Sequence, residues 1–304
     1  MISKLTNTYS IVAVDTDRQE MGVAVQSHVF SAGSIVPWGI AGVGVVATQS
    51  LVNIDFGPRG LALLDAGLQP PGVVEALLAT DDRQIYRQLA VASPDGTVAA
   101  HTGERCIREA GHATGAGVVC AANMMEKSTV WNAMLEAYEA SDGPLAGRML
   151  AAMEAAEDEG GDIRGKQSAG ILVVSTVKHP SVAENRLVDI RVEDNPDPVR
   201  EIRRLLTLHT AYRRAEEGDN ALAAGDPVAA ERAFAEAFSL YPDSLELRYW
   251  MALGLASTGE IGRARELLAP VYAADPRRQE LTRRLKETRL FTLSEEGWEQ
   301  ITSL

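Results

Sequence analysis

The sequence lacks the features that mark membrane-spanning, secreted and disulfide-stabilised proteins. Its longest uninterrupted apolar run, residues 39–47, is far shorter than the ~20 residues that cross a bilayer. Residues 1–7 contain no apolar core like that of a signal peptide. Cys106 and Cys120 are the only cysteines, and without a CxxC spacing they indicate neither a disulfide framework nor a zinc knuckle. We therefore expect a cytoplasmic protein.

Basic residues are scarce relative to acidic ones. The chain has 29 Lys and Arg residues against 42 Asp and Glu residues, a formal net charge of −13 and a pI of about 4.9. An acidic surface repels a polyanion, so we expect neither nucleic acid nor an anionic membrane as a partner. With 304 residues, 46% of them hydrophobic, the chain can bury a full core and exceeds the usual length of one domain.

Groups of strands alternate with pairs of helices in the first two thirds of the sequence. Strands are expected at residues 9–16, 21–29, 34–38, 42–49, 84–100, 117–123, 166–176 and 186–192. Helices are expected at residues 58–80, with a break at Pro70 and Pro71, and at residues 128–140 and 144–159. This order is not the regular βαβ alternation of a doubly wound sheet, and it indicates sheets covered by helical layers. We expect an α+β fold, a four-layer αββα sandwich.

A helical repeat follows an acidic, proline-containing linker at residues 193–198. Identical residues recur with a period of 34, at Gly225 and Gly259, Ala230 and Ala264, and Pro242 and Pro276. The first repeat has the tetratricopeptide order, with Gly218, Gly225, Ala230, Phe234, Ala237 and Pro242. Because a stable solenoid usually needs at least ~3 repeats, we expect these helices to dock on the first domain, on a partner protein or on another copy of the chain.

Three segments follow from this organisation. The first domain is expected at residues 8–195 and the tetratricopeptide-like repeats at residues 197–290. A C-terminal tail is expected at residues 291–304.

Several short motifs occur in the first domain in a fixed order. They are Thr8-Tyr9-Ser10-Ile11-Val12-Ala13, Ala47-Thr48-Gln49, Phe56-Gly57-Pro58-Arg59-Gly60-Leu61, His101-Thr102-Gly103, Gly111-His112 and GGDIRGKQSA at residues 160–169. Together they resemble the family catalogued as domain of unknown function 1028, over roughly residues 8–192. That family is classed by fold with the N-terminal-nucleophile (Ntn) hydrolases, and the layout of the first two strands looks like that class. The resemblance implies the fold and, through that class, nucleophile chemistry at a chain terminus, but membership of the family names neither a reaction nor a substrate.

The resemblance implies that Thr8 is a nucleophile. In an Ntn hydrolase a chain-terminal Thr, Ser or Cys attacks the substrate, and its own α-amino group, with a pKa near ~8, acts as the base. Residues 1–7 precede Thr8, so they must be removed, either by attack of the Thr8 hydroxyl on the Asn7 carbonyl or by another peptidase. The alternative is that Thr8 is a β-branched residue that simply starts a strand.

An amide-cleaving site also needs donors for the oxyanion and a charge that orients the nucleophile. Asn123 at the end of one strand and Ser168 at the start of another are candidate donors, with a turn cap and a buried hydroxyl as the alternatives. Asp162 lies in a glycine-containing loop and is assigned to orienting the ammonium group. The expected catalytic residues are thus Thr8, Asn123, Asp162 and Ser168.

Three residues are expected to bind substrate, namely Gln49, Arg164 and Gln167. Arg164 could hold a substrate carboxylate, although an ion pair within its loop is the alternative. Gln49 and Gln26 lie on strands expected to flank Thr8. Either side chain could hydrogen-bond substrate or satisfy backbone groups inside the sheet.

No cofactor is expected. The glycines at Gly39, Gly42 and Gly44 miss both the dinucleotide and the Walker spacings. His101 and His112 permit a metal site, but they lack an HExxH spacing and a third nearby imidazole, so turn histidines are favoured. Three hypotheses remain: an Ntn-type amidohydrolase acting on a small amide or peptide-like substrate, a non-catalytic scaffold that recruits a partner through its repeats, and a metal-dependent hydrolase.

Overall fold

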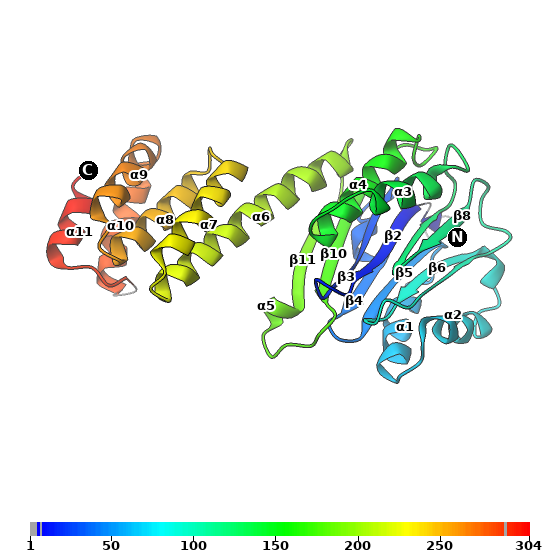
Figure 1. The fold of residues 1–304 in the computed structure, drawn as a ribbon. Helices are drawn as coiled ribbons and strands as arrows, with labels where there is room; N and C mark the ends of the chain where they lie inside the picture. Colours follow the sequence, from blue (N-terminus) through cyan, green and yellow to red (C-terminus); the bar gives the residue numbers. More distant parts are fainter. Residues whose placement is uncertain (1–4, 7, 289–290) are drawn as a thin grey trace. The chain divides into compact units, whose positions relative to one another are not determined.

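The protein is described from a computed structural model, which covers residues 5–6, 8–288 and 291–304 (Figure 1). The chain divides into two compact units, Met1–Leu206 and Thr207–Leu304. The first unit combines helices with antiparallel sheets, and the described part of the second contains helices alone. The division falls within the long helix α6 (Pro198–Ala223), later than the linker at which the sequence suggests a boundary. Among the described residues, no helix has both the length and the apolar character needed to cross a membrane.

The larger sheet of the first unit has six strands in the order β11-β10-β3-β2-β9-β8. The strands are β2 (Thr8–Asp15), β3 (Glu20–Ser27), β8 (Gly111–Gly115), β9 (Val118–Ala122), β10 (Ser168–Ser175) and β11 (Arg186–Val192). Every neighbouring pair is antiparallel. β2 and β3 form the hairpin expected from the sequence, with Thr8 opposite Ser27. Thr8 therefore begins an inner strand of this sheet.

The second sheet has the order β1-β5-β6-β7, and β4 also pairs with β5. Its strands are β1 (Leu5–Thr6), β4 (Pro37–Ile40), β5 (Gly44–Leu51), β6 (Arg87–Ala92) and β7 (Val98–Thr102). A short 3₁₀ helix at Ala32–Ser34 replaces the start of the strand expected at residues 34–38. The Ser34 hydroxyl donates to the Ser31 carbonyl at 2.8 Å, a local bond that competes with strand pairing.

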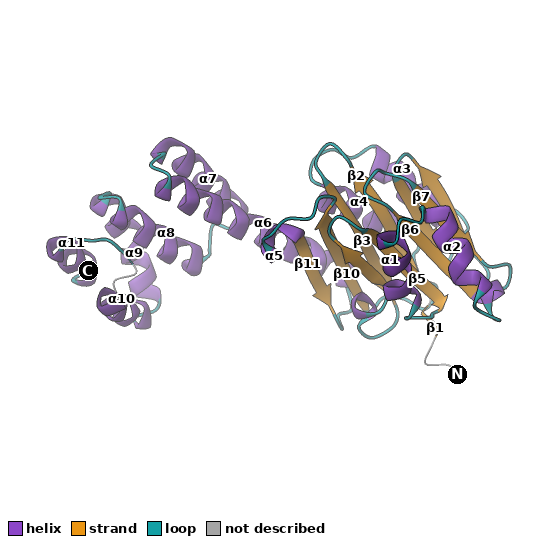
Figure 2. Ribbon diagram, turned by 90° about the horizontal axis from the view of Figure 1, so that it is seen from below, coloured by secondary structure: helices purple, strands orange, loops and turns teal. Residues whose placement is uncertain are grey.

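Helix pairs cover the outer face of each sheet (Figure 2). α1 (Phe56–Asp65) and α2 (Pro70–Ala79) pack on the five-stranded sheet, and α3 (Val130–Glu139) and α4 (Leu145–Asp158) pack on the six-stranded sheet. Between the sheets lies a separate apolar cluster, to which both sheets contribute. The strands carry side chains alternately toward this inner layer and toward the helices, as the pleat requires.

The start of α2 and the presence of β8 differ from the sequence prediction. α2 begins at Pro70, so Pro70 and Pro71 lie in its first turn. A backbone N–H has no intrahelical partner there, so proline, which lacks this group, costs the helix no hydrogen bond. β8 was not expected, because it is short and has glycine at both ends. Gly111 is nonetheless required there, since a Cβ at this position would lie 2.6 Å from the Trp131 ring.

The second unit continues from α6 through α7 (Pro227–Leu240), α8 (Leu245–Ser257), α9 (Ile261–Ala274), α10 (Arg277–Thr288) and α11 (Glu295–Thr302). The small and aromatic residues of the repeat pattern meet where helices cross, as Phe234 does against Gly218. Residues 291–304, expected as a tail, contain α11. Its Trp298 and Ile301 are buried in the same apolar cluster as Tyr249.

Replacing Gly218 with alanine should destabilise the helical unit, because a Cβ there would lie 2.4 Å from the Phe234 ring. Overpacking costs about 1–3 kcal/mol, more than the ~1 kcal/mol that alanine gains over glycine in helix propensity. Gly262→Ala is the matched control, since no heavy atom lies within 4 Å of a Cβ at that helical position. The midpoint temperature of thermal unfolding should fall for Gly218→Ala and rise slightly for Gly262→Ala. A Gly218→Ala variant at least as stable as the parent would contradict this close contact.

Candidate functional site

A cluster of polar side chains lies buried between the two sheets. Thr8 and Ser10 on β2, Gln49 on β5, Gln88 on β6 and Asn123 after β9 are each at most 1% exposed. Apolar residues two or four positions away on the same strands form the core between the sheets, so these polar side chains share that inner face. We call these five residues the Thr8 cluster.

Gln88 connects the members of the Thr8 cluster. Its Nε2 donates to Ala122 O at 2.8 Å, Thr102 Oγ1 at 2.9 Å and Gly111 O at 3.1 Å. Its Oε1 accepts from Gln49 Nε2 at 2.7 Å and from Asn123 Nδ2 at 2.9 Å. Carbonyl oxygens can only accept, so the two backbone contacts fix which way the Gln88 amide points. The nitrogens of Gln49 and Asn123 must then face Gln88.

The backbone carbonyl of Thr8 is held by the same amides. It accepts from Asn123 N at 3.1 Å, Asn123 Nδ2 at 3.3 Å and Gln49 Nε2 at 3.4 Å. Both hydrogens of Asn123 Nδ2 are thus engaged, one toward Thr8 and one toward Gln88. For Asn123 to act as the expected oxyanion donor, one of these bonds must be given up.

Four polar atoms of the Thr8 cluster have no hydrogen-bond partner in the described part of the chain. They are Thr8 Oγ1, Ser10 Oγ, Gln49 Oε1 and Asn123 Oδ1. Leaving a buried polar atom unpaired costs about 1–3 kcal/mol, and buried polar groups are therefore nearly always bonded. Such a concentration in one place is typical of a site whose partner is a ligand or a reacting group.

Strained backbone flanks two of these amides. Ser50, directly after Gln49, has φ 69°, and Met124, directly after Asn123, has φ 57°. A non-glycine residue in the left-handed region costs on the order of 1–3 kcal/mol, and such residues gather at functional sites. The two conformations turn the chain at the places where Gln49 and Asn123 enter the cluster.

Ser168, a predicted donor, lies near Thr8 in the sheet but is already bonded. Ser168 pairs with Ser27, which pairs with Thr8, so a strand separates the two residues. The Ser168 hydroxyl donates to Val29 O at 2.5 Å and accepts from Ala32 N at 2.9 Å. Its hydrogen therefore holds the segment after β3 in place.

Asp162 and Arg164 form a tight pair within their loop. Arg164 Nη2 donates to Asp162 Oδ2 at 2.7 Å, and Arg164 Nε donates to Oδ1 at 3.1 Å. The Asp162 side chain is fully buried, whereas that of Arg164 is 30% exposed. Asp162 also accepts from His28 N at 3.2 Å, one residue beyond Ser27, so the carboxylate lies at the same end of the sheet as Thr8.

Gln167 and Gln26 lie outside the Thr8 cluster. Gln167 Nε2 donates to Asp194 Oδ1 at 3.1 Å. Gln26 stands opposite Tyr9 in the register, and both face α4 rather than the inner layer. The Tyr9 hydroxyl donates to Glu157, and burial followed by the Glu157 charge raises the pKa of Tyr9 well above its ordinary value.

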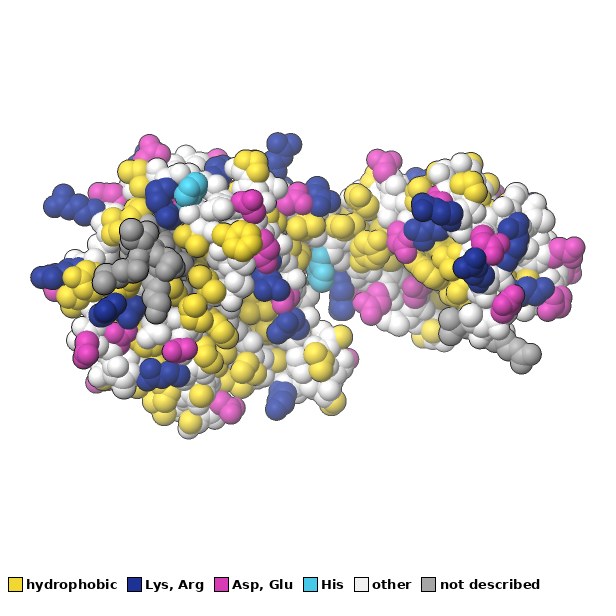
Figure 3. Space-filling view, turned by 180° about the vertical axis from the view of Figure 1, so that it is seen from behind, with side chains coloured by type: hydrophobic (Ala, Val, Ile, Leu, Met, Phe, Trp, Pro, Cys, Tyr) yellow, Lys and Arg dark blue, Asp and Glu magenta, His cyan; other side chains and the backbone are white. Residues whose placement is uncertain are grey.

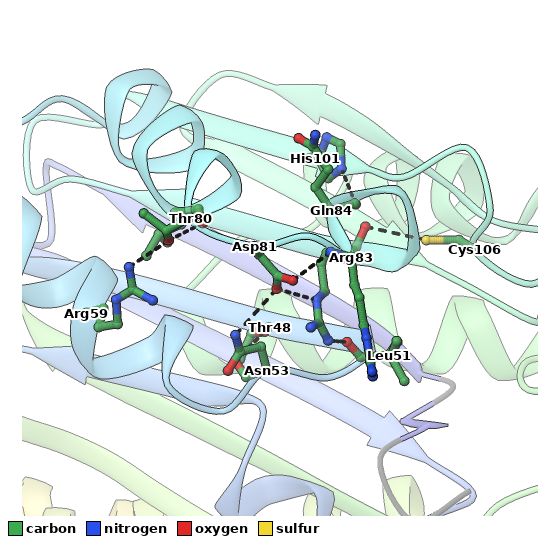
Figure 4. Close-up of polar contacts among 12 residues, drawn as sticks. Thr48, Leu51, Asn53, Arg59, Thr80, Asp81, Arg83, Gln84, His101 and Cys106 are labelled. Carbon is green, nitrogen blue, oxygen red and sulfur yellow. Dashed lines mark hydrogen bonds and ion pairs between the residues drawn. The ribbon is translucent and has the colours of Figure 1, made fainter. Parts of the chain in front are cut away.

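A buried ion pair supports the end of β5, beside Gln49. Arg87 Nε lies 2.7 Å from Asp81 Oδ2, and their side chains are 8% and 9% exposed. Arg87 also donates to the Leu51 carbonyl, and Arg83 N donates to Asp81 Oδ1 at 2.8 Å (Figure 4). Burial alone would raise the pKa of Asp81, but the hydrogen bonds from Arg87 and Arg83 outweigh it and hold this pKa below its ordinary value.

The two histidines considered as metal ligands bond to protein groups. His101 Nε2 lies 3.1 Å from Gln84 O, and His112 Nδ1 lies 2.9 Å from Thr102 Oγ1. Burial, and then the neighbouring His101, lowers the pKa of His112. Within the ranges that the structure describes, no group of three His, Cys, Asp or Glu residues is arranged to hold a metal ion.

Comparison with known proteins places the first unit in a family. The family of unknown function DUF1028 matches residues 8–202, which is more than half of the chain. The chain belongs to the DUF1028 family. A crystal structure of a DUF1028 protein from Silicibacter pomeroyi is similar, with 30% identity and a TM-score of 0.60 over 67% of this chain and 89% of that chain. A tetratricopeptide repeat family matches residues 221–286. No curated protein matches the chain.

The motifs that carry the family resemblance supply most of the Thr8 cluster. The first motif of the DUF1028 unit gives Thr8 and Ser10, and the second gives Gln49. Gln88 belongs to none of them, and sequence reasoning missed it. In the sequence, Gln88 is marked by its alternation with Ala90 and Ala92 in a strand-like run. Its position directly opposite Gln49 follows from the structure.

Proposed function

We propose that the DUF1028 unit is an Ntn-type amidohydrolase on a four-layer αββα sandwich, with Thr8 as its nucleophile. The observation that carries this proposal is the Thr8 cluster. A buried threonine begins an inner strand, its hydroxyl has no partner in the described part of the chain, and two amide oxygens beside it also lack one. A threonine that only started a strand would not need this polar surrounding.

Removal of residues 1–7 creates the α-amino group that this chemistry needs. Residues 1–4 and 7 lie outside the described residues, so cleavage at Asn7–Thr8 stays a prediction from the sequence. In self-cleavage the Thr8 hydroxyl attacks the Asn7 carbonyl, and the Asn7–Thr8 C–N bond breaks as an ester forms. Water then hydrolyses the ester and releases residues 1–7. Another peptidase would give the same terminus.

The freed Thr8 then cleaves a substrate amide. Its amine takes the hydroxyl proton as Oγ attacks the carbonyl, and passes that proton to the leaving amine. Water hydrolyses the acyl ester and restores Thr8. Gln49 Oε1 and Asn123 Oδ1 accept from the protonated amine, because both are acceptors without a partner in the described residues and their amide nitrogens already hold the Thr8 backbone.

The remaining predicted site residues have more limited roles in this proposal. Asp162 orients the ammonium group only if the carboxylate is released from Arg164, whose guanidinium balances its charge at 2.7 Å. Ser168 positions the segment after β3. Arg164 and Gln167 bind substrate only if it replaces their present partners, Asp162 and Asp194.

The mass of the mature chain tests the proposal. Protein purified under mild conditions should lack residues 1–7, and N-terminal sequencing should begin at Thr8. Thr8→Ser should process in the same way, because serine also supplies a hydroxyl. A chain that retains Met1 while it hydrolyses amides would overturn Thr8 as the nucleophile.

A second candidate function is partner binding through the helical repeats, without catalysis. The helical unit has a groove of about 550 Å³, whose lining includes Asp219, Trp250, Gly254 and Phe291. On the face of the helical unit that Figure 3 draws, basic and acidic side chains lie next to one another, which favours a partner that carries charges of both signs. Partner capture by a chain that retains Met1 and shows no hydrolysis would favour this scaffold role.

A further inference from the structure

A surface depression of about 580 Å³ lies on the DUF1028 unit where β7 ends and β8 begins. Thr102, Gly111 and His112 line it from these strands, and Trp131 lines it from α3. The lack of a side chain at Gly111 lets the Trp131 ring lie against the backbone, where a Cβ would meet it at 2.6 Å. The depression thus has an aromatic wall next to polar groups, which is typical of a small-molecule site.

Charges of both signs surround this depression. Glu104, Arg108 and Glu109 line it and are exposed. None of the three makes an ion pair or a side-chain hydrogen bond in the described part of the chain. Two carboxylates and a guanidinium are therefore available to a ligand that carries both an ammonium and a carboxylate group.

Gln88 is the residue that joins this depression to the Thr8 cluster. On one side its Nε2 donates to Thr102 Oγ1 at 2.9 Å and to Gly111 O at 3.1 Å, and both residues line the depression. On the other side its Oε1 accepts from Asn123 Nδ2, which also reaches the Thr8 carbonyl. The carbonyl oxygen and the N–H of a peptide bond can replace the partners of Gln88 in these hydrogen bonds, because Gln88 itself both donates and accepts.

The polar groups at this boundary are neutral ones. Thr102 Oγ1 accepts from Gln88 Nε2 and lies 2.9 Å from His112 Nδ1, and either of these two atoms can be the donor. Burial lowers the pKa of His112, which favours the neutral imidazole. The boundary therefore carries no charge of its own, and it suits the neutral amide at the centre of a peptide.

We infer that this depression is the substrate pocket of the Thr8 site and that it takes short peptides with free ends. Arg108 pairs with the carboxylate, Glu104 or Glu109 pairs with the ammonium group, and Trp131 covers an apolar side chain. The inference rests on the proposed function and names its substrate class. Peptide entry displaces the amide contacts of Gln88 and gives the scissile bond access to Thr8.

Cys106 offers a direct measure of occupancy, because it lines the depression. Burial raises the pKa of both thiols, but Cys106 is partly exposed whereas Cys120 is completely buried. The rate of Cys106 alkylation by iodoacetamide is followed by peptide mass mapping in the full-length Thr8→Val protein, which does not consume the probe. The probe is a pooled library of dipeptides with free ends, compared with the same library acetylated and amidated.

The free-ended library should slow Cys106 alkylation, and the capped library should not. Arg108→Gln should weaken protection on the order of tenfold, the loss expected for one hydrogen bond to a charged group. Arg83→Gln is the matched control, an exposed arginine of the same unit that does not line the depression. Equal protection by both libraries, or none by either, would overturn the pocket. Protection by the free-ended library with no hydrolysis by the parent protein would support the pocket and overturn the hydrolase.

Discussion

Replacing Thr8 with valine should abolish amide hydrolysis and leave the fold at least as stable as before. Valine keeps the shape of threonine and removes only the hydroxyl. Thr8 Oγ1 is buried without a partner in the described part of the chain, so its removal breaks no hydrogen bond and lifts a cost of about 1–3 kcal/mol. Loss of the nucleophile should lower the rate on the order of 10³-fold or more. The measurements are amine release from the free-ended dipeptide library and thermal unfolding.

Thr48→Val is the matched control for this prediction. Thr48 is also a buried strand threonine, but its hydroxyl donates to Asn53 O at 3.2 Å on the helix side of β5 (Figure 4). Its loss should cost about 1 kcal/mol of stability and leave hydrolysis unchanged. Thr8→Val should therefore lose hydrolysis and keep its stability, whereas Thr48→Val should keep hydrolysis and lose stability. If Thr8→Val destabilises the protein and Thr48→Val does not, or if Thr8→Val still hydrolyses the library, Thr8 has a structural role.

The same Thr8→Val variant separates the two routes to the mature terminus. If the chain cleaves itself, the variant should retain residues 1–7, because no hydroxyl is present to attack Asn7. If another peptidase acts, the variant should lack residues 1–7, begin at the substituted position and still be inactive. Intact mass distinguishes these outcomes, and either is compatible with Thr8 as the nucleophile of the amidohydrolase.

The sequence predicted the elements of the fold better than the contacts of the site. The hairpin of β2 and β3 follows from two alternating apolar runs around a polar turn, which is a local signal. The helical repeats follow from a period of 34 residues, and the repeat match at residues 221–286 confirms them. Both features depend on residues close together in the chain or repeated along it.

The site depends on pairings that a single sequence does not contain. Gln49 and Gln88 meet because β5 pairs with β6. Gln49 reaches Thr8, and Gln88 reaches Asn123, only because the two sheets face each other. Asn123 and Gln49 were identified as candidates, but nothing in the sequence indicates that their amide nitrogens are engaged by Thr8 and Gln88. The left-handed conformations of Ser50 and Met124 are equally hidden, because neither residue type favours them.

Replacing Asp81 with asparagine should destabilise the first unit by about 3 kcal/mol, because it leaves the buried Arg87 guanidinium without its counter-charge. Arg87 also donates to the Leu51 carbonyl, and it lies opposite Ser50 in the register of β5 and β6. Loosening this pair therefore loosens the end of β5, from which Gln49 enters the Thr8 cluster. We expect hydrolysis to fall as well, with the loss larger at temperatures close to unfolding.

The dependence of this effect on pH follows from the lowered pKa of Asp81. A carboxylate whose pKa is lower in the folded state stabilises the protein above its unfolded pKa of ~3.9, and this stability is lost as the pH falls through the folded value. The stability gap between the parent protein and Asp81→Asn should be full at neutral pH and should close in acid. Asp82→Asn, an exposed neighbour, should stay within about 0.5 kcal/mol of the parent throughout. A gap that persists when Asp81 is protonated would show that shape, and not charge, holds the end of β5.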